Sequence, residues 1–458
     1  MALTTADAGV GTEVFVDASA PGGGDGSRAR PFRALADAPG HGRLRLAAGL
    51  YPGGLLLEEV ELVGGPAVVL SASASGPCVR TRGTVRVEGV QIQGGAAGLV
   101  VEGGRTTLAS VAFSGQRRAA LEVAGGAELL VAASTVQASV SGLPGVRILP
   151  GGKAELRQVR FQGPFQRAID ATGPASLRLS DVRIQDAVTG LWLSGGAAVV
   201  ESMEVRGGRG PGLYVAGAAL QLRDVRVAGH EYGLLTGDGA RLDGRGVSST
   251  GAERAGVAFV RSKGVLEDVH VDSAGPMGGV QLISSEVRIR RLQVQGGVSS
   301  GLVTRDAQLT LESGVITGPS SADPAEGDAI QIRGGRATLG GLRIADCSGI
   351  GVLAAEGATV TLARSTVSGA GVAGVAAETE ARLSTSEVSI ERTRGPAVLV
   401  TDHGTAQLRA TTARSNRDGA LWAECSQGVD VEIDGWTGDV TPMPAPCVRG
   451  VWAVTPRR

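Results

Sequence analysis

Four side chains suited to binding a sugar recur at nearly equal intervals along the chain. Arg147, Asp170, Trp192 and Tyr214 are separated by 23, 22 and 22 residues. Aromatic faces stack on sugar rings, while arginine and aspartate form hydrogen bonds with hydroxyl or carboxylate groups. Such chemistry requires the four residues to share one surface, so the interval must correspond to a repeating structural element.

A repeat of this length runs through most of the chain. Each unit begins with Gly or Ala, continues with Leu, Val or Ile and then any residue, and usually ends with an apolar residue. Successive starts lie 21 to 28 residues apart between Gly98 and Ala420. Two further short runs follow, as in Gly212–Val215, Leu220–Leu222 and Val225–Val227. Each run alternates apolar and variable residues, which is typical of a strand with one buried face.

Three strands in about 22 residues predict one turn of a parallel β-helix. A single turn cannot bury its apolar face, so the turns must stack with their strands about 4.8 Å apart. The third residue of each unit then forms an outward ladder on which Arg147, Asp170, Trp192 and Tyr214 are neighbours. The turns before these strands add four candidates for the same binding site: Arg167, Arg209, His230 and Glu231. The alternative is an aromatic ladder that only stabilises a flat sheet face.

The repeat resembles that of the right-handed parallel β-helix proteins of the pectate-lyase-like superfamily. The opening is similar too, in the segments Phe15-Val16-Asp17, Gly24-Asp25-Gly26-Ser27, Pro31-Phe32 and Leu44 to Tyr51. The resemblance implies an all-β fold with right-handed winding. It also implies a short N-terminal helix, at residues 31–38, that caps the open end.

The ends of a solenoid expose strand edges and need caps. We therefore expect a disordered or processed N-terminus at residues 1–11 and a strand with a cap at 12–50. Parallel β-helix coils should follow at 51–435, and a C-terminal cap at 436–458.

The cysteines bear on the C-terminal cap. Cys425 and Cys447 lie 22 residues apart, which is one coil and allows a bridgeable distance. A disulfide there would hold the cap and imply an oxidising compartment. Two reduced, buried cysteines are the alternative. Cys78 and Cys347 are expected to be buried singly.

An insertion near residues 319–328 is the best candidate for a metal site. It carries Asp323, Glu326 and Asp328. Calcium takes six to eight oxygen ligands, so three carboxylates could contribute to a calcium site. A solvated acidic loop is the favoured alternative, and the sequence predicts no other cofactor.

No recognised catalytic motif is present, so no catalytic residue is predicted. Gly327–Ile332 is similar to the acidic turn of polygalacturonases, but the paired aspartates, Gly-His-Gly and Arg-Ile-Lys of that family are absent. The cluster of calcium-binding aspartates with a basic residue that pectate lyases use is absent as well.

Charge and hydropathy restrict the partners. Lys and Arg total 44 and Asp and Glu total 45, so a net charge of −1 provides no general attraction to nucleic acid or anionic membranes. No transmembrane run and no signal peptide are visible. We expect a secreted or cell-surface scaffold that binds a polymer, favouring a polysaccharide, along its side. The alternatives are a polysaccharide lyase or glycoside hydrolase with an unrecognised site, and a self-assembling structural module; the oligomeric state is not predicted.

Overall fold

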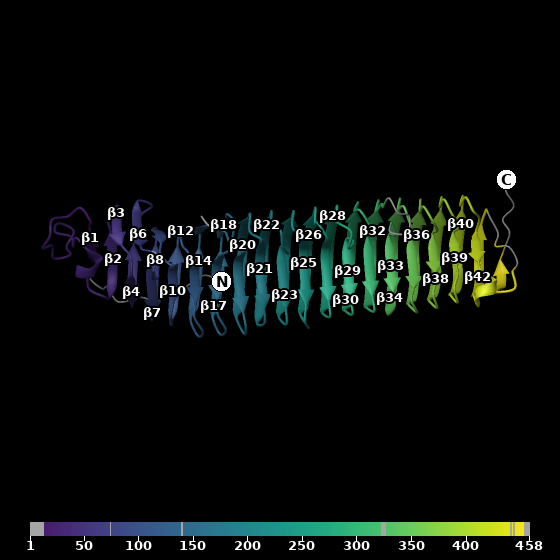
Figure 1. The fold of residues 1–458 in the computed structure, drawn as a ribbon, viewed down its shortest axis with the longest axis horizontal. Coiled ribbons are helices and arrows are strands. Elements are labelled where there is room, and N and C mark those ends of the chain that lie inside the picture. The colour runs from purple at the N-terminus through teal and green to yellow at the C-terminus, as the bar shows by residue number, and fades with distance from the viewer. Residues whose placement is uncertain are drawn as a thin grey trace. The chain divides into compact units, whose positions relative to one another are not determined.

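The computed structural model describes residues 13–73, 75–138, 141–321, 327–439, 442 and 445–452. The chain divides into two compact units, Met1–Gly208 and Arg209–Arg458. Within each unit the strands pair in parallel and form two sheets, which we call A and B (Figure 1). The predicted all-β fold, a right-handed parallel β-helix, is confirmed.

In the first unit, sheet B supplies one strand per coil and sheet A the remaining strands. Sheet B comprises β4 (Leu55–Glu58), β7 (Val79–Arg82), β10 (Ala97–Val101), β13 (Ala119–Val123), β16 (Pro144–Ile148), β19 (Arg167–Thr172) and β21 (Thr189–Ser194). Sheet A comprises β1 (Glu13–Val16), β2 (Gly42–Leu46), β3 (Gly49–Pro52), β5 (Val60–Val63), β6 (Val68–Ala72), β8 (Thr84–Glu88), β9 (Gln91–Gly94), β11 (Arg105–Ala109), β12 (Ala112–Ser114), β14 (Glu128–Ala132), β15 (Thr135–Gln137), β17 (Lys153–Arg157), β18 (Arg160–Gln162), β20 (Ser176–Gln185) and β22 (Ala197–Arg206).

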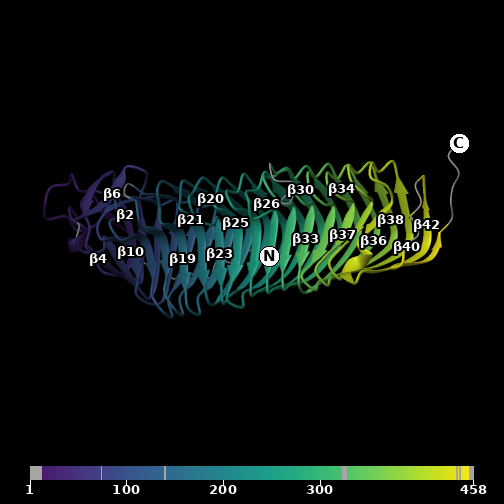
Figure 2. The ribbon, with the colours of Figure 1, turned by 45° about the vertical axis from the view of Figure 1, so that its right-hand side comes forward.

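The second unit repeats this arrangement with greater regularity. Sheet B comprises β23 (Leu213–Ala216), β25 (Tyr232–Gly237), β27 (Ala255–Val260), β29 (Val280–Ile283), β31 (Leu302–Arg305), β33 (Ile330–Arg333), β35 (Val352–Ala355), β37 (Val375–Ala377), β39 (Val398–Val400) and β41 (Leu421–Ala423). Sheet A comprises β24 (Ala219–Ala228), β26 (Arg241–Thr250), β28 (Lys263–Asp272), β30 (Glu286–Gln295), β32 (Gln308–Thr317), β34 (Arg336–Ala345), β36 (Thr359–Ser368), β38 (Arg382–Glu391), β40 (Thr405–Arg414), β42 (Asp430–Gly438) and β43 (Val448–Trp452). Strands of sheet B such as β33 and β37 lie in a row (Figure 2).

The long strands of sheet A bend at their sixth residue. That residue has a positive φ, as at Asp181 (φ 51°), Asp268 (φ 57°) and Arg291 (φ 57°). Aspartate and glycine tolerate this left-handed conformation better than most residues. The second and third predicted runs of each coil are therefore joined into one bent strand from β20 onward.

The core lies between the two sheets and is filled by apolar side chains. On β27 and β28, Val257, Phe259, Leu266 and Val271 are almost completely buried. Gly264 leaves space for the Phe259 ring, since a Cβ at residue 264 would lie 2.4 Å from Phe259 Cε1. This packing fixes which side of each strand faces outward.

The N-terminal helix predicted for residues 31–38 is wrong. Phe32 forms a parallel β-bridge with Val16, and only a 3-10 turn, η1 (Leu35–Asp37), follows. Ala34 precedes this turn and provides no side-chain cap, and none of the turn's residues is buried. A helix there would lack both an N-cap and a packed face. No helix in the described ranges is long and apolar enough to cross a membrane.

The C-terminal end is held by a disulfide. Cys425, in the 3-10 turn η3 (Cys425–Gln427), is bonded to Cys447, and their Cα atoms are 5.3 Å apart. Strand β43 follows Cys447 and pairs in parallel with β42. Cys78 and Cys347 are free and buried, and burial raises the pKa of each thiol to about 11.

Candidate functional site

The predicted ladder exists within each unit. In the first unit, the Cα register runs through Val100, Glu122, Arg147, Asp170 and Trp192. In the second unit it runs through Tyr214, Leu235, Ala258, Gln281 and Val303. The first unit therefore contains Arg147, Arg167, Asp170 and Trp192, and the second unit contains Arg209, Tyr214, His230 and Glu231.

A depression of about 340 Å³ lies over sheet B of the first unit, beside β13, β16 and β19. We call it the arginine depression because four of its lining residues are arginines. They are Arg117, Arg118, Arg147 and Arg167, and Asp170 lines it too. The sequence predicted Arg147, Arg167 and Asp170 to lie together, and the structure brings them together.

Two of these arginines are held by carboxylates. Arg118 Nη2 donates to Glu122 Oε2 at 2.6 Å, and Arg167 Nη1 donates to Asp170 Oδ1 at 3.1 Å. Glu122 and Asp170 are each only 8% exposed. Largely buried carboxylates orient both guanidinium groups at the rim of the depression.

Trp192 holds Arg167 from the other side. The Arg167 Cζ atom lies 3.8 Å from the centroid of the Trp192 ring, and Trp192 on β21 is half-buried. This distance is typical of a cation–π contact. One face of the Trp192 ring is thus covered by Arg167 and is not open to a sugar.

Arg117 and Arg147 differ from this pair. Both are exposed, and neither has an ion-pair or side-chain hydrogen-bond partner among the described residues. With Glu122 included, four guanidinium groups face two carboxylates. The arginine depression therefore has excess positive charge and suits an anionic ligand.

In the second unit, the candidates differ in exposure. Tyr214 is half-buried and Arg209 is exposed. His230, predicted to contact ligand, is only 1% exposed, and its Nδ1 lies 3.1 Å from the Gly210 carbonyl oxygen. The prediction for His230 is therefore wrong, because a buried ring that bonds to the backbone cannot reach a ligand on the surface.

Glu231 belongs to a cluster that the sequence did not indicate. Arg254 Nη1 donates to Glu231 Oε1 at 3.0 Å, and Arg254 Cζ lies 5.5 Å from the centroid of the Tyr232 ring. The Tyr232 hydroxyl donates to Met277 Sδ at 3.3 Å, and burial raises the pKa of Tyr232. The negative charge of Glu231 is thus neutralised by Arg254.

The calcium candidates can be described only in part. Asp323 and Glu326 lie outside the described residues. Asp328 is 1% exposed; its Oδ1 accepts the Ile350 N–H at 2.7 Å and its Oδ2 accepts from Gln331 Nε2 at 3.2 Å. Burial raises the pKa of Asp328 to about 6. Within the described ranges no group of three His, Cys, Asp or Glu residues could hold a metal ion.

Sequence reasoning missed Arg117 and Arg118. The signal was available, because both residues immediately precede β13, as Gln166 immediately precedes β19.

Comparisons with known proteins are consistent with this architecture. A family model described as the right handed beta helix region matches residues 278–435. Among curated proteins, none has a sequence that matches this chain.

Three solved structures are similar to the chain at low sequence identity. Tailspike protein 3 of bacteriophage CBA120 is 10% identical with a TM-score of 0.33, over 86% of this chain and 56% of the tailspike. The catalytic unit of a GH87 α-1,3-glucanase from Streptomyces thermodiastaticus is 14% identical with a TM-score of 0.30, over 97% and 70%. A mannuronan C-5 epimerase A-module from Azotobacter vinelandii is 13% identical with a TM-score of 0.20, over 88% and 92%. The chain thus spans just over half the length of that tailspike.

Proposed function

We propose that the chain binds an acidic polysaccharide at the arginine depression. The observation that carries this proposal is the pair of exposed cations, Arg117 and Arg147, which have no ion-pair or side-chain hydrogen-bond partner in the described part of the chain and lie beside the held Arg167. Guanidinium groups bind carboxylate and sulfate oxygens through paired hydrogen bonds.

Preorganisation favours binding at this place. Asp170 and Trp192 restrict Arg167, and Glu122 restricts Arg118. Side chains that are already ordered lose less conformational entropy when a ligand binds. Arg117 and Arg147 would supply the uncompensated positive charge. Arg118 and Arg167, held by carboxylates, would orient the bound ligand.

We also propose that the protein is located outside the reducing cytosol. The Cys425–Cys447 disulfide supports it, because disulfides persist mainly in oxidising compartments. Acidic polysaccharides of envelopes and matrices are encountered in such places, either by a secreted protein or by one held at a cell surface.

The test is a binding measurement with oligogalacturonate and alginate oligosaccharides, using a neutral maltooligosaccharide for comparison. Arg117→Ala/Arg147→Ala should weaken binding of the acidic ligands at least tenfold. Arg178→Ala/Arg183→Ala, which removes two exposed arginines from β20 on sheet A of the same unit, should change it little. Equal binding by the two double variants, or equal binding of neutral and acidic ligands, would contradict the proposal.

Cleavage of the bound polymer is a second candidate function, favoured by one observation. Glu122 and Asp170 occupy the same ladder on either side of Arg147. Their Cα atoms are two strand spacings apart, roughly 9.6 Å. This Cα spacing lies just above the range of about 6.5–9.5 Å that separates the two carboxyl groups of inverting glycosidases. However, both carboxylates are largely buried against arginines, which suits a positioning role better. New reducing or unsaturated ends that disappear in Asp170→Asn would favour cleavage; their absence in the wild type would exclude it for that substrate.

A further inference from the structure

A second charged hollow lies on the other sheet of the second unit. It is a groove of about 540 Å³ that crosses β24, β26, β28, β30, β32 and β34 on sheet A. We call it the sheet A groove. Two columns of outward side chains flank it, because residues in register on successive strands stack above one another. The groove therefore runs across the strands and not along them.

Basic side chains outnumber acidic ones in the sheet A groove. Arg241, Lys263, Arg288 and Arg336 line it, with Asp243 and Glu286 as the acidic residues. Lys263 Nζ donates to Glu286 Oε2 at 2.6 Å, and this contact lowers the pKa of Glu286. That pair is neutral, so the remaining lining carries three arginines and one aspartate.

The three arginines are available to a ligand. Arg241, Arg288 and Arg336 are exposed, and no ion pair or side-chain hydrogen bond engages them in the part of the chain that the structure describes. Between them, Val265 is 50% exposed and offers an apolar surface. A sugar ring has both kinds of surface, a C–H face for Val265 and polar substituents for the arginines.

The spacing of the arginines indicates a polymer. Arg241 lies on β26, Arg288 on β30 and Arg336 on β34, so one arginine occurs on every second strand. Two strand spacings amount to about 9.6 Å along the groove. In an extended acidic polysaccharide with two sugars per helical turn, every second sugar presents its carboxylate to the same side, and a disaccharide has a comparable length.

A nucleic acid matches the sheet A groove less well. Phosphates recur about every 3.4 Å along one strand of a duplex, far more closely than these arginines. Single strands are bound by aromatic side chains that stack on the bases, and the described lining residues include none.

We propose that the sheet A groove is a binding site for a linear acidic polysaccharide that lies across the strands, with its carboxylates on Arg241, Arg288 and Arg336. The sheet A groove belongs to the second unit and to sheet A, whereas the arginine depression belongs to the first unit and to sheet B. The two proposed binding sites are therefore independent of each other. If both bind, the protein holds an acidic polymer through two separate surfaces.

The test uses the full chain with Arg117→Ala/Arg147→Ala as background, so that the arginine depression does not contribute. In this background, Arg288→Ala/Arg336→Ala should weaken alginate oligosaccharide binding at least tenfold by calorimetry. The matched control is Arg290→Ala/Arg343→Ala, which removes two exposed arginines from the same strands, β30 and β34, beyond the groove lining. It should retain the affinity within about twofold.

Three outcomes would overturn the proposal for the groove. They are equal losses in the two double variants, no loss in Arg288→Ala/Arg336→Ala, and tighter binding of single-stranded DNA than of alginate. Unchanged melting temperatures establish that the variants fold. If the arginine depression does not bind the polymer, Arg117→Ala/Arg147→Ala will bind it as tightly as the wild type does. That result is distinguishable from a failure of the groove.

Discussion

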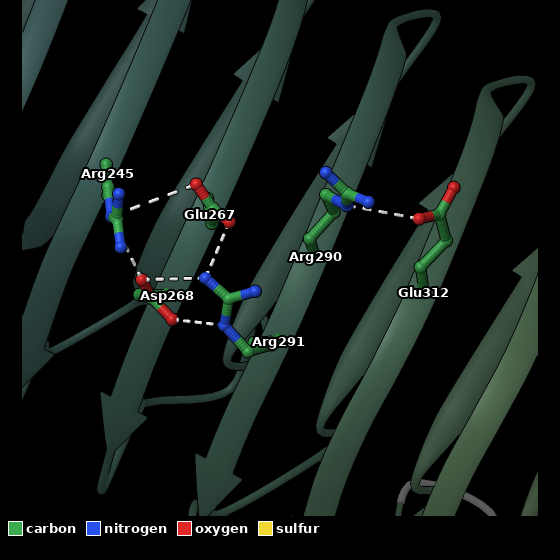
Figure 3. A network of polar contacts seen from close by, with 6 residues as sticks. All are labelled: Arg245, Glu267, Asp268, Arg290, Arg291 and Glu312. Carbon is green, nitrogen blue, oxygen red and sulfur yellow. Dashed lines mark hydrogen bonds and ion pairs between the residues drawn. The ribbon is translucent and has the colours of Figure 1, made fainter.

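Two regions of sheet A in the second unit occupy the same strands and treat their arginines in opposite ways. At the bend, Arg245, Arg290 and Arg291 all have carboxylate partners (Figure 3). In the sheet A groove, a few residues earlier on the strands, Arg241 and Arg288 have none among the described residues. Composition does not explain this difference, since acidic residues are present beside both regions.

The bend shows what charge pairing does for the fold. Arg291 donates to Asp268 Oδ1 at 2.6 Å, to Asp268 Oδ2 at 3.0 Å and to Glu267 Oε1 at 2.6 Å. These hydrogen bonds lower the pKa of Asp268 and raise that of Arg291. Asp268 and Arg291 are also the residues with positive φ, so the network ties together adjacent strands where each one turns.

Pairing with a carboxylate, and not charge alone, distinguishes arginines that stabilise the fold from arginines that can bind a ligand. Exposed ion pairs individually contribute little stability, but a network of several charges can hold a local geometry. Arginines on one face without carboxylate partners repel one another and form no such network. Such residues are therefore the better candidates for a ligand.

The largest expected effect comes from a change that damages both regions together. Gly264 faces the core beneath the groove, and its strand continues into the bend. Gly264→Val would force a side chain against the buried Phe259 ring, so the free energy of unfolding should fall by about 1–3 kcal/mol. Urea unfolding followed by circular dichroism measures it.

A compensating variant checks the cause. Phe259→Leu in the Gly264→Val protein makes room for the new side chain and should recover part of the lost stability. Gly264→Val with wild-type stability would show that the core does not require the glycine.

A smaller effect should follow from converting the groove into a paired region. Val265 is in register with Arg288 on the next strand. In the Arg117→Ala/Arg147→Ala background, Val265→Glu should bring a carboxylate to Arg288 and weaken alginate binding several-fold at unchanged melting temperature. Val265→Thr is the control, because it keeps the branched shape without a charge. Equal affinities of the two variants would argue against electrostatic recognition in the groove.

The smallest expected effect concerns the bend and its pH dependence. The lowered pKa of Asp268 means that its stabilising contribution is present above the unfolded-state pKa and is lost as the pH falls through the lower native value. Asp268→Asn keeps a residue that tolerates positive φ but removes the charge. Wild type should be slightly more stable than Asp268→Asn at neutral pH, and the difference should shrink well below pH 3.9, the ordinary aspartate pKa.

Chemical denaturation of both proteins across that range measures the effect. A difference that is constant with pH would mean that the carboxylate charge does not act at the bend. Alginate binding at neutral pH should be equal in the two proteins, which separates the bend from the groove.

The fold was largely predictable, and the candidate site only partly. The interval between Arg147 and Asp170 gave their register correctly, because a coil of constant length repeats its strand positions. Arg117 and Arg118 were missed although they directly precede a predicted strand, because the strand repeat alone does not show which turn side chains lie beside the ladder. The groove arginines were missed because Arg241 and Arg336 belong to one column and Arg288 to the other.

The coil length, the parallel stacking and the side of each strand that faces the core can all be derived from the order of the amino acids alone. These follow from a local alternation of apolar residues and a regular interval, both of which are visible along the chain. The three-dimensional packing was needed to show that His230 is buried, that residues 31–38 form only the 3-10 turn η1, and that some arginines pair with carboxylates while others have no such partner among the described residues. Such outcomes depend on side-chain conformations and turn paths between neighbouring coils, which no one-dimensional pattern specifies.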